Sequence, residues 1–143
     1  MTLGALRDAG YVPCGVRDEM RRNLVSRIER GQRLFPGIIG YDDTVIPEIE
    51  NAVLSGHHIV LLGERGQGKT RLIRGLIDLL DEETPAVEGC EINDDPLRPV
   101  CAACRRRAEA QGSDLPLTWL RREARYGEKL ATPDTSVGDL IGD

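Results

Sequence analysis

Residues 57–70 read His-His-Ile-Val-Leu-Leu-Gly-Glu-Arg-Gly-Gln-Gly-Lys-Thr, and a run with helical spacing follows them at 71–80. The apolar run 57–62 is typical of a buried parallel strand, and residues 63–70 match the phosphate-binding pattern G-x-x-x-x-G-K-[ST]. The leucines and isoleucines of 71–80 recur on one helix face. This strand, loop and helix order is the setting that the pattern requires, so the sequence predicts a nucleotide site here.

Each part of the glycine-rich loop has a chemical reason. Residues without a Cβ let successive backbone N–H groups curl toward phosphate oxygens, and the helix that follows adds unsatisfied N–H groups at its start. Lys69 would place its charge beside the β- and γ-phosphates, and the Thr70 hydroxyl would help to coordinate Mg²⁺. Only one other lysine, Lys129, occurs in the chain. The predicted nucleotide-binding residues of the loop are Gly63, Glu64, Arg65, Gly66, Gln67, Gly68, Lys69, Thr70 and Arg71.

A second acidic motif does not follow this loop. A hydrolytic site of this kind also needs a carboxylate at the end of another strand to hold Mg²⁺ and a residue to orient the attacking water. The nearest acidic run, at 77–82, continues the period of the helix after the loop, and no later apolar run ends in Asp-Glu. The sequence therefore predicts nucleotide binding rather than independent hydrolysis, and it offers no catalytic residue.

The composition fits one globular domain or a part of one. The chain has 143 residues, of which 40% are hydrophobic and 30% charged, as is ordinary for soluble proteins. Its net charge of −5 and its 3% aromatic content argue against a nucleic-acid partner, which basic patches and stacking rings would bind. No run approaches the roughly 20 apolar residues of a membrane span, and no signal pattern is present. We expect a cytoplasmic protein with no membrane partner.

Helices are predicted before the loop. Residues 1–15 hold several glycines with little periodicity, so we expect a mobile leader. Residues 16–30 carry apolar side chains at helical spacing among charged ones, which indicates an amphipathic helix. Another helix is expected up to residue 54, capped by Asp42 or Asp43.

Arginines are frequent in the last third of the chain. They are Arg105, Arg106, Arg107, Arg121, Arg122 and Arg125. A basic patch for nucleic acid or for phosphates on a neighbouring subunit is one interpretation. Solvated helix faces are favoured, since the chain as a whole is acidic. Residues 117–126 are predicted to form a short helix anchored by Trp119 and Leu120.

Three of the four cysteines lie close together in a proline-rich, acidic stretch. Cys101 and Cys104 have the C-x-x-C spacing of half a zinc site, and Cys90 could be a third Zn²⁺ ligand. Asp94, Asp95, a histidine from elsewhere or a residue of a partner could be the fourth. Redox chemistry and plain packing of thiols remain open. A zinc-binding interaction module centred on these cysteines is the alternative to a nucleotide-binding function.

Four segments follow one another in a distinctive order: Phe-Pro-Gly-Ile-Ile-Gly-Tyr at 35–41, the loop at 63–70, the cysteine-containing insertion at about 86–110 and Thr-Ser-Val-Gly-Asp at 135–139. In this order they resemble the front part of the magnesium-chelatase-type AAA+ ATPases. The resemblance implies an α/β fold, with an incomplete P-loop NTPase αβα core and a cysteine-containing insertion after the P-loop helix. It divides the chain into a leader with an amphipathic helix (1–33) and the N-terminal part of an AAA+ domain (34–143).

The same resemblance implies a function. The family binds ATP and Mg²⁺ between neighbouring subunits of a ring, and hydrolysis remodels a protein partner. We therefore expect a ring-forming homo-oligomer with a remodelled protein partner, whose hydrolysis depends on downstream sequence or on neighbouring subunits. Apolar side chains one helix before the loop can form an adenine slot. The residues that match the family's adenine segment are Ile38, Ile39, Gly40 and Tyr41.

Overall fold

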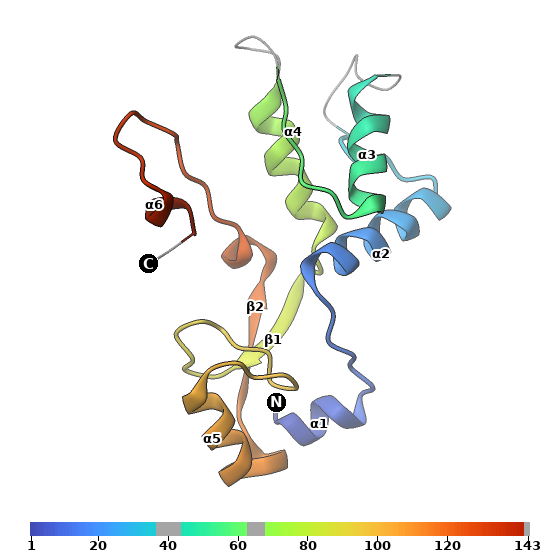
Figure 1. Cartoon of the computed structure of the whole chain (residues 1–143). Helices are drawn as coiled ribbons and strands as arrows, with labels where there is room; N and C mark the ends of the chain where they lie inside the picture. The colour runs from blue at the N-terminus through green and yellow to red at the C-terminus, as the bar shows by residue number, and fades with distance from the viewer. Residues whose placement is uncertain (37–43, 63–67, 142–143) are drawn as a thin grey trace.

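The computed structural model describes residues 1–36, 44–62 and 68–141. Its helices are α1 (Leu3–Asp8), α2 (Val16–Glu29), α3 (Val45–Ser55), α4 (Lys69–Gly75), α5 (Ala102–Gln111) and α6 (Val137–Ile141). Its strands are β1 (Glu83–Val87) and β2 (Leu117–Arg121), and its 3-10 turns are η1 (Leu76–Leu79), η2 (Gly112–Asp114) and η3 (Arg122–Arg125). The helices α2, α3 and α4 lie at one end of the strand pair, and α1 and α5 lie at the other (Figure 1).

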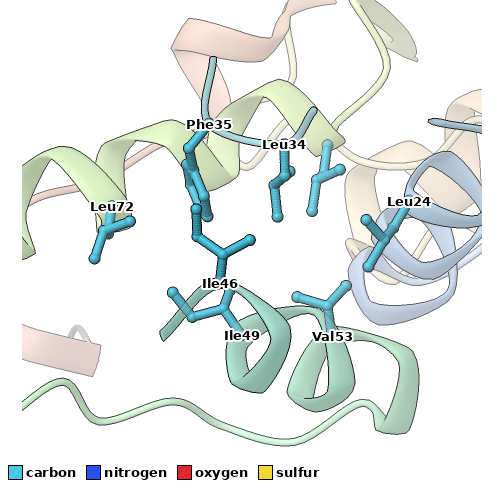
Figure 2. Close-up of a cluster of buried hydrophobic side chains, with 8 residues drawn as sticks. Leu24, Leu34, Phe35, Ile46, Ile49, Val53 and Leu72 are labelled. Atoms are coloured by element: carbon cyan, nitrogen blue, oxygen red, sulfur yellow. The ribbon is translucent and has the colours of Figure 1, made fainter. Parts of the chain in front are cut away.

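These two ends are called here the helical side (residues 16–36, 44–62 and 68–80) and the cysteine side (residues 1–10 and 83–121). The helical side encloses the larger core, in which side chains of α2, α3 and α4 point toward one another (Figure 2). Burying one such side chain contributes roughly 1.5–3 kcal/mol. The core residues are Leu24, Leu34, Phe35, Ile46, Ile49, Val53, Leu72 and Leu79.

The α3 helix shows how the sequence builds this core. Ile46, Ile49 and Val53 are buried and lie three or four residues apart, which places them on one helix face. Pro47 stands in the first turn, where a proline costs no hydrogen bond. Gly56 ends the helix in the left-handed conformation, with φ of 70°, as is common for a glycine at that position.

The cysteine side is organised by the antiparallel pair of β1 and β2. Glu83 lies opposite Arg121, and Val87 lies opposite Leu117. A smaller core packs beside the pair, and it consists of Leu3, Val87, Cys104 and Leu115.

Residues 1–15 do not form a mobile leader, so this prediction is wrong. Leu3 and Leu6 of α1 are each only 2% exposed. The backbone N–H of Leu3 donates to the carbonyl oxygen of Leu115 at 3.0 Å, and that of Leu117 donates to the carbonyl of Met1 at 3.0 Å. The N-terminal residues are thus bonded to the start of β2. Long-range pairing of this kind leaves no local signal in a short segment rich in glycine.

The predicted strand at 57–62 is also absent. Residues 57–62 have no regular secondary structure, and Val60 and Leu62 are 80% and 91% exposed. No strand among the described residues pairs with this segment. A strand needs neighbours to satisfy its backbone groups, so an apolar sequence alone does not make one.

The segment predicted as a helix at 117–126 is β2 followed by η3. Leu120 lies opposite Thr84 and Trp119 lies opposite Pro85 in the pair. Thr118 and Trp119 favour strands, and pairing with β1 decides the outcome. Trp119 is 40% exposed, so it does not anchor a core.

The helices predicted on either side of residue 36 and after the loop are confirmed as α2, α3 and α4. The predicted cap residues Asp42 and Asp43 lie outside the described residues. The described chain consists of helices and one two-stranded sheet, which is consistent with a fragment of an α/β fold. In this part of the chain, no helix has the length and apolar character required to cross a membrane.

Candidate functional site

The glycine-rich loop is described from Gly68 onward, and Gly63, Glu64, Arg65, Gly66 and Gln67 lie outside the described residues. Gly68 precedes α4 with φ of 76°, a conformation that a side chain disfavours. Lys69 is half-buried. It is the first residue of α4.

Thr70 and Arg71 follow Lys69 in the first turn of α4, and both are exposed. The predicted adenine segment, Ile38, Ile39, Gly40 and Tyr41, also lies outside the described residues. The structure therefore describes Gly68, Lys69, Thr70 and Arg71 of the predicted nucleotide site, at the start of one helix.

A cavity of about 280 Å³ lies beside Lys69. Its walls come from the start of α3, from residues 60–62 and from Leu72 of α4. Val45 and Leu72 give it an apolar lining, whereas Lys69 and Glu48 bring one charge of each sign. Ligand pockets typically enclose about 300–1,000 Å³. The cavity lies just below this range, so it has room for only part of a nucleotide, and it borders Lys69 of the predicted site.

Gly75, the last residue of α4, packs against the segment that precedes the predicted adenine residues. A Cβ at Gly75 would lie 2.8 Å from both Cδ1 and Cε1 of the Phe35 ring. The ring thus packs directly on the α4 backbone, and it stands close in sequence to Ile38. This contact was not predicted from the sequence, although a glycine inside a helical run can mark a place where another group packs closely on the helix.

A buried ion pair holds the segment after β2 against α2. The Arg125 guanidinium donates to Glu19 through Nη1 to Oε2 at 2.7 Å and through Nη2 to Oε1 at 2.8 Å. The side chains of Glu19 and Arg125 are 4% and 16% exposed. The hydrogen bonds to Glu19 raise the pKa of Arg125. The backbone N–H of Asp81 also donates to Glu19 Oε2 at 2.7 Å.

Several arginines predicted to be solvated are in fact bonded to protein groups. Arg105 Nε donates to the Pro99 carbonyl at 3.1 Å, and Arg107 Nη1 donates to the Glu88 carbonyl at 2.8 Å. The Arg122 side chain is 18% exposed, and its Nη1 lies 3.8 Å from Oδ1 of Asp78. The prediction of solvated faces is therefore wrong for Arg122 and Arg125, whereas Arg105 is exposed as predicted. The partners of Arg122 and Arg125 are distant in sequence, which a local pattern does not reveal.

Three of the four cysteines come together with one carboxylate. One ligand atom each from Cys90, Asp94, Cys101 and Cys104 lies within 4.8 Å of all the others. Cys90 lies in the turn after β1, whereas Cys101 immediately precedes α5 and Cys104 lies in its first turn. Cys104 is 2% exposed. Such a group could hold a metal ion.

Asp94 rather than Asp95 completes this cluster. The Asp94 side chain is buried, and its Oδ2 accepts from the backbone N–H groups of Cys101 at 2.8 Å and Val100 at 2.9 Å. The Asp95 carboxylate instead accepts from Leu97 N–H at 2.8 Å. Among the described residues, the group of possible metal ligands contains neither histidine.

The thiols of the cluster differ in acidity. Burial raises the pKa of the Cys104 thiol to about 12, and the neighbouring thiols of Cys90 and Cys101 add to the rise. Hydrogen bonds from the backbone N–H groups of Asp94 and Ile92 lower the pKa of Cys90. Metal ions bind the thiolate form of cysteine, so a bound ion would have to displace the Cys104 proton.

Comparisons with known proteins find relatives of two kinds, magnesium-chelatase subunits and an ATP-binding protein. The chloroplastic magnesium-chelatase subunit ChlI-2 of Arabidopsis thaliana is 34% identical over 106 residues, which are 72% of this chain and 21% of the relative. The magnesium-chelatase subunit ChlI of Nicotiana tabacum is 31% identical over 101 residues, 68% of this chain and 23% of the relative. The phosphate import ATP-binding protein PstB 2 of Natronomonas pharaonis is 32% identical over 117 residues, 79% of this chain and 41% of the relative.

The resemblance inferred from the sequence is confirmed to a defined extent. Part of the chain is a region similar to AAA+ and P-loop ATPases. The chain spans well under half the length of each of these relatives, from 21% to 41%. No family model matches it, and no solved structure matches it significantly.

Proposed function

We propose that the chain binds ATP together with Mg²⁺ at residues 63–70, as the nucleotide-holding part of an AAA+ ATPase. The observation that carries this proposal is the similarity to proteins named as magnesium-chelatase subunits and as an ATP-binding protein. The described half of the loop supports it. Gly68 has the backbone conformation of a glycine-dependent turn, and Lys69 borders a cavity with apolar walls.

The roles of the residues follow from their chemistry. The backbone N–H groups of Gly63 to Gly68 would bind phosphate oxygens. Lys69 would neutralise the β- and γ-phosphates, and Thr70 would share in holding Mg²⁺. Residues 38–41 would contact the adenine.

Hydrolysis and assembly belong to the same proposal. The chain would act with neighbouring copies in a ring and would remodel a protein partner, with hydrolysis supplied by residues outside this sequence or by the neighbouring subunit. Two of the relatives are named magnesium-chelatase subunits, which fits a protein that acts together with other subunits. The domain boundary after residue 33 and the cytoplasmic location also stay predictions.

A pair of lysine substitutions tests ATP binding. The change Lys69→Ala should weaken Mg–ATP binding by at least about 10-fold, because one charge-assisted hydrogen bond contributes about 1.5–3 kcal/mol. Lys129→Ala is the matched control, because it removes the only other lysine and should leave binding unchanged. Isothermal titration calorimetry of the full chain measures both, and circular dichroism shows whether each variant folds. Equal affinity in the wild type and in Lys69→Ala would overturn the proposal.

A further inference from the structure

The cysteine side holds a second group of ligand-type side chains, well apart in sequence from the glycine-rich loop. We propose that Cys90, Asp94, Cys101 and Cys104 form a closed structural Zn²⁺ site with three thiolate ligands and one carboxylate ligand. Zinc sites in which protein residues fill all four positions are structural. This inference does not rest on ATP binding, and the zinc-binding and nucleotide-binding functions can coexist in one chain.

The distances within the group suit zinc. A Zn–S bond of about 2.3 Å in a tetrahedron separates neighbouring sulfurs by about 3.8 Å. The ligand atoms of the cluster already lie within 4.8 Å of one another. The longest of these separations therefore has to shorten by at most about 1 Å.

Two segments of fixed shape present the ligands. Gly89 and Asn93 have φ of 77° and 53°, so the chain turns sharply on both sides of Cys90. At the other segment, Cys101 and Cys104 are three residues apart at the start of α5, and residues at this spacing share a helix face. The thiols therefore converge from a turn and from the start of a helix.

Asp94 adds a buried carboxylate to the three thiols. Its side chain is only 5% exposed, and the hydrogen bonds that the structure describes for its carboxylate come from backbone N–H groups of Val100 and Cys101. Buried charges are usually paired or bound to a metal. Oδ1 receives a single bond, at 3.1 Å from Val100 N–H, and so retains a lone pair for a metal ion.

Neighbouring arginines hold the two ligand-bearing segments in place. Arg107 donates to the carbonyl of Glu88 and Arg105 donates to that of Pro99, and each carbonyl lies two residues before a ligand cysteine. Three thiolates and a carboxylate around Zn²⁺ leave a net negative charge. Positively charged guanidinium groups close by would help to offset that charge.

The apolar cluster around the site is small, which favours a metal on this side. Among the described residues it has four members, one of which is Cys104 itself, and Leu6, Ala86 and Leu117 are also buried on this side. Small apolar cores rarely stabilise a fold on their own, and natural small units add a metal or disulfides. A bound Zn²⁺ would connect β1 to α5 across this core.

The test measures the metal content of the full chain by mass spectrometry after exposure to Zn²⁺ and gel filtration. We expect one Zn²⁺ per chain. Replacing Zn²⁺ with Co²⁺ should give intense thiolate charge-transfer absorption and the visible bands of a tetrahedral ion. Because it uses the unmodified protein, this measurement does not depend on whether a variant folds. A chain that binds no Zn²⁺, or that carries iron instead, would overturn the proposal.

Substitutions then assign the ligands. Cys14→Ser is the matched control, because Cys14 is an exposed cysteine outside the cluster, and it should keep one Zn²⁺ per chain. Cys90→Ser should lose Zn²⁺, and Asp94→Asn should weaken the affinity at least about 10- to 100-fold. Unchanged Zn²⁺ affinity in both cluster variants would contradict the assignment. The Zn²⁺ measurements contain no nucleotide, so a failure of the ATP proposal would leave them unaffected.

Discussion

The two sides of the molecule are stabilised in different ways. The helical side packs eight buried apolar residues from α2, α3, α4 and their neighbours into one core. The cysteine side has a smaller cluster of four such residues, with further buried side chains such as Leu6 and Leu117 outside it, and it also holds a group of thiols with a buried carboxylate. The comparison teaches that one large apolar core holds the first side, whereas polar groups contribute more to the second.

Polar contacts hold α2 against the segments that border the strand pair. The pair of Glu19 and Arg125 joins α2 to the segment that follows β2. Arg22 and Asn23, on the next turn of α2, both reach Asp81 just before β1. These contacts are electrostatic, and they can be broken without touching either core.

Breaking the buried ion pair should have the largest effect. Arg125→Ala leaves Glu19 buried without its guanidinium partner, which typically costs about 3–5 kcal/mol of the free energy of unfolding. The control is Arg121→Ala. The Arg121 side chain is 75% exposed, and its Nε lies 3.5 Å from Glu123 Oε2. Its removal should lower the free energy of unfolding by less than about 1 kcal/mol. Urea unfolding measures both. Similar small effects in the two variants would show that the sides do not depend on this pair.

Truncating one leucine in each core compares the two sides directly. Leu79 and Leu115 are both fully buried, so Leu79→Ala and Leu115→Ala should each cost about 2–5 kcal/mol. Only Leu115 packs in the cluster that contains Cys104. We therefore expect Leu115→Ala to weaken Zn²⁺ binding and Leu79→Ala to leave it unchanged. Equal loss of Zn²⁺ affinity in the two variants would contradict the division into sides.

A glycine substitution tests the packing next to the proposed nucleotide site. Gly75→Ala forces the Phe35 ring away from α4, because the new Cβ would lie 2.8 Å from two ring atoms. Overpacking of this kind costs about 1–3 kcal/mol. Gly127→Ala is the control, since no atom lies within 4 Å of its added Cβ. Thermal unfolding compares them, and an unshifted melting temperature in Gly75→Ala would mean that Phe35 is not held on α4.

The smallest effect concerns Asp81 and pH. Burial alone would raise the pKa of this carboxyl, but hydrogen bonds from Arg22 and Asn23 outweigh burial and lower it. Because the folded pKa is the lower one, the contribution of Asp81 to stability is present above the ordinary Asp pKa of about 3.9. It is lost as the pH falls through the folded value.

The Asp81 side chain is 41% exposed, so Asp81→Asn should cost less than about 1 kcal/mol at pH 7. The measurement is the free energy of unfolding of the wild type and of Asp81→Asn between pH 7 and acid. The difference between them should shrink toward zero below pH 3.9. A difference that stays constant across this range would exclude an electrostatic role.

Local patterns in the sequence predicted the helical side well. The apolar periods of α2, α3 and α4 depend on residues within a few turns, and all three helices are present. The sequence likewise predicted Cys90, Cys101 and Cys104 as one group and left several candidates for a fourth member, and the structure places Asp94 with the three cysteines.

Predictions that depended on distant partners were less successful. The apolar run at 57–62 pairs with no described strand, whereas residues 117–121 become a strand because β1 lies opposite. Arg125 reaches Glu19 across 106 positions, and such an ion pair leaves no spacing to recognise. Composition and period specify local conformation, but they do not specify which strands or charges meet.

One measurement addresses both proposed ligands of the chain at once. Native mass spectrometry of the full chain with Zn²⁺ and Mg–ATP counts each ligand per chain. We expect one Zn²⁺ and one nucleotide on the wild type, loss of the nucleotide alone in Lys69→Ala and loss of the Zn²⁺ alone in Cys90→Ser. A wild-type chain that carries neither ligand, or a Lys69→Ala chain that keeps its nucleotide, would contradict the assignment of ATP to the loop and Zn²⁺ to the cysteine side.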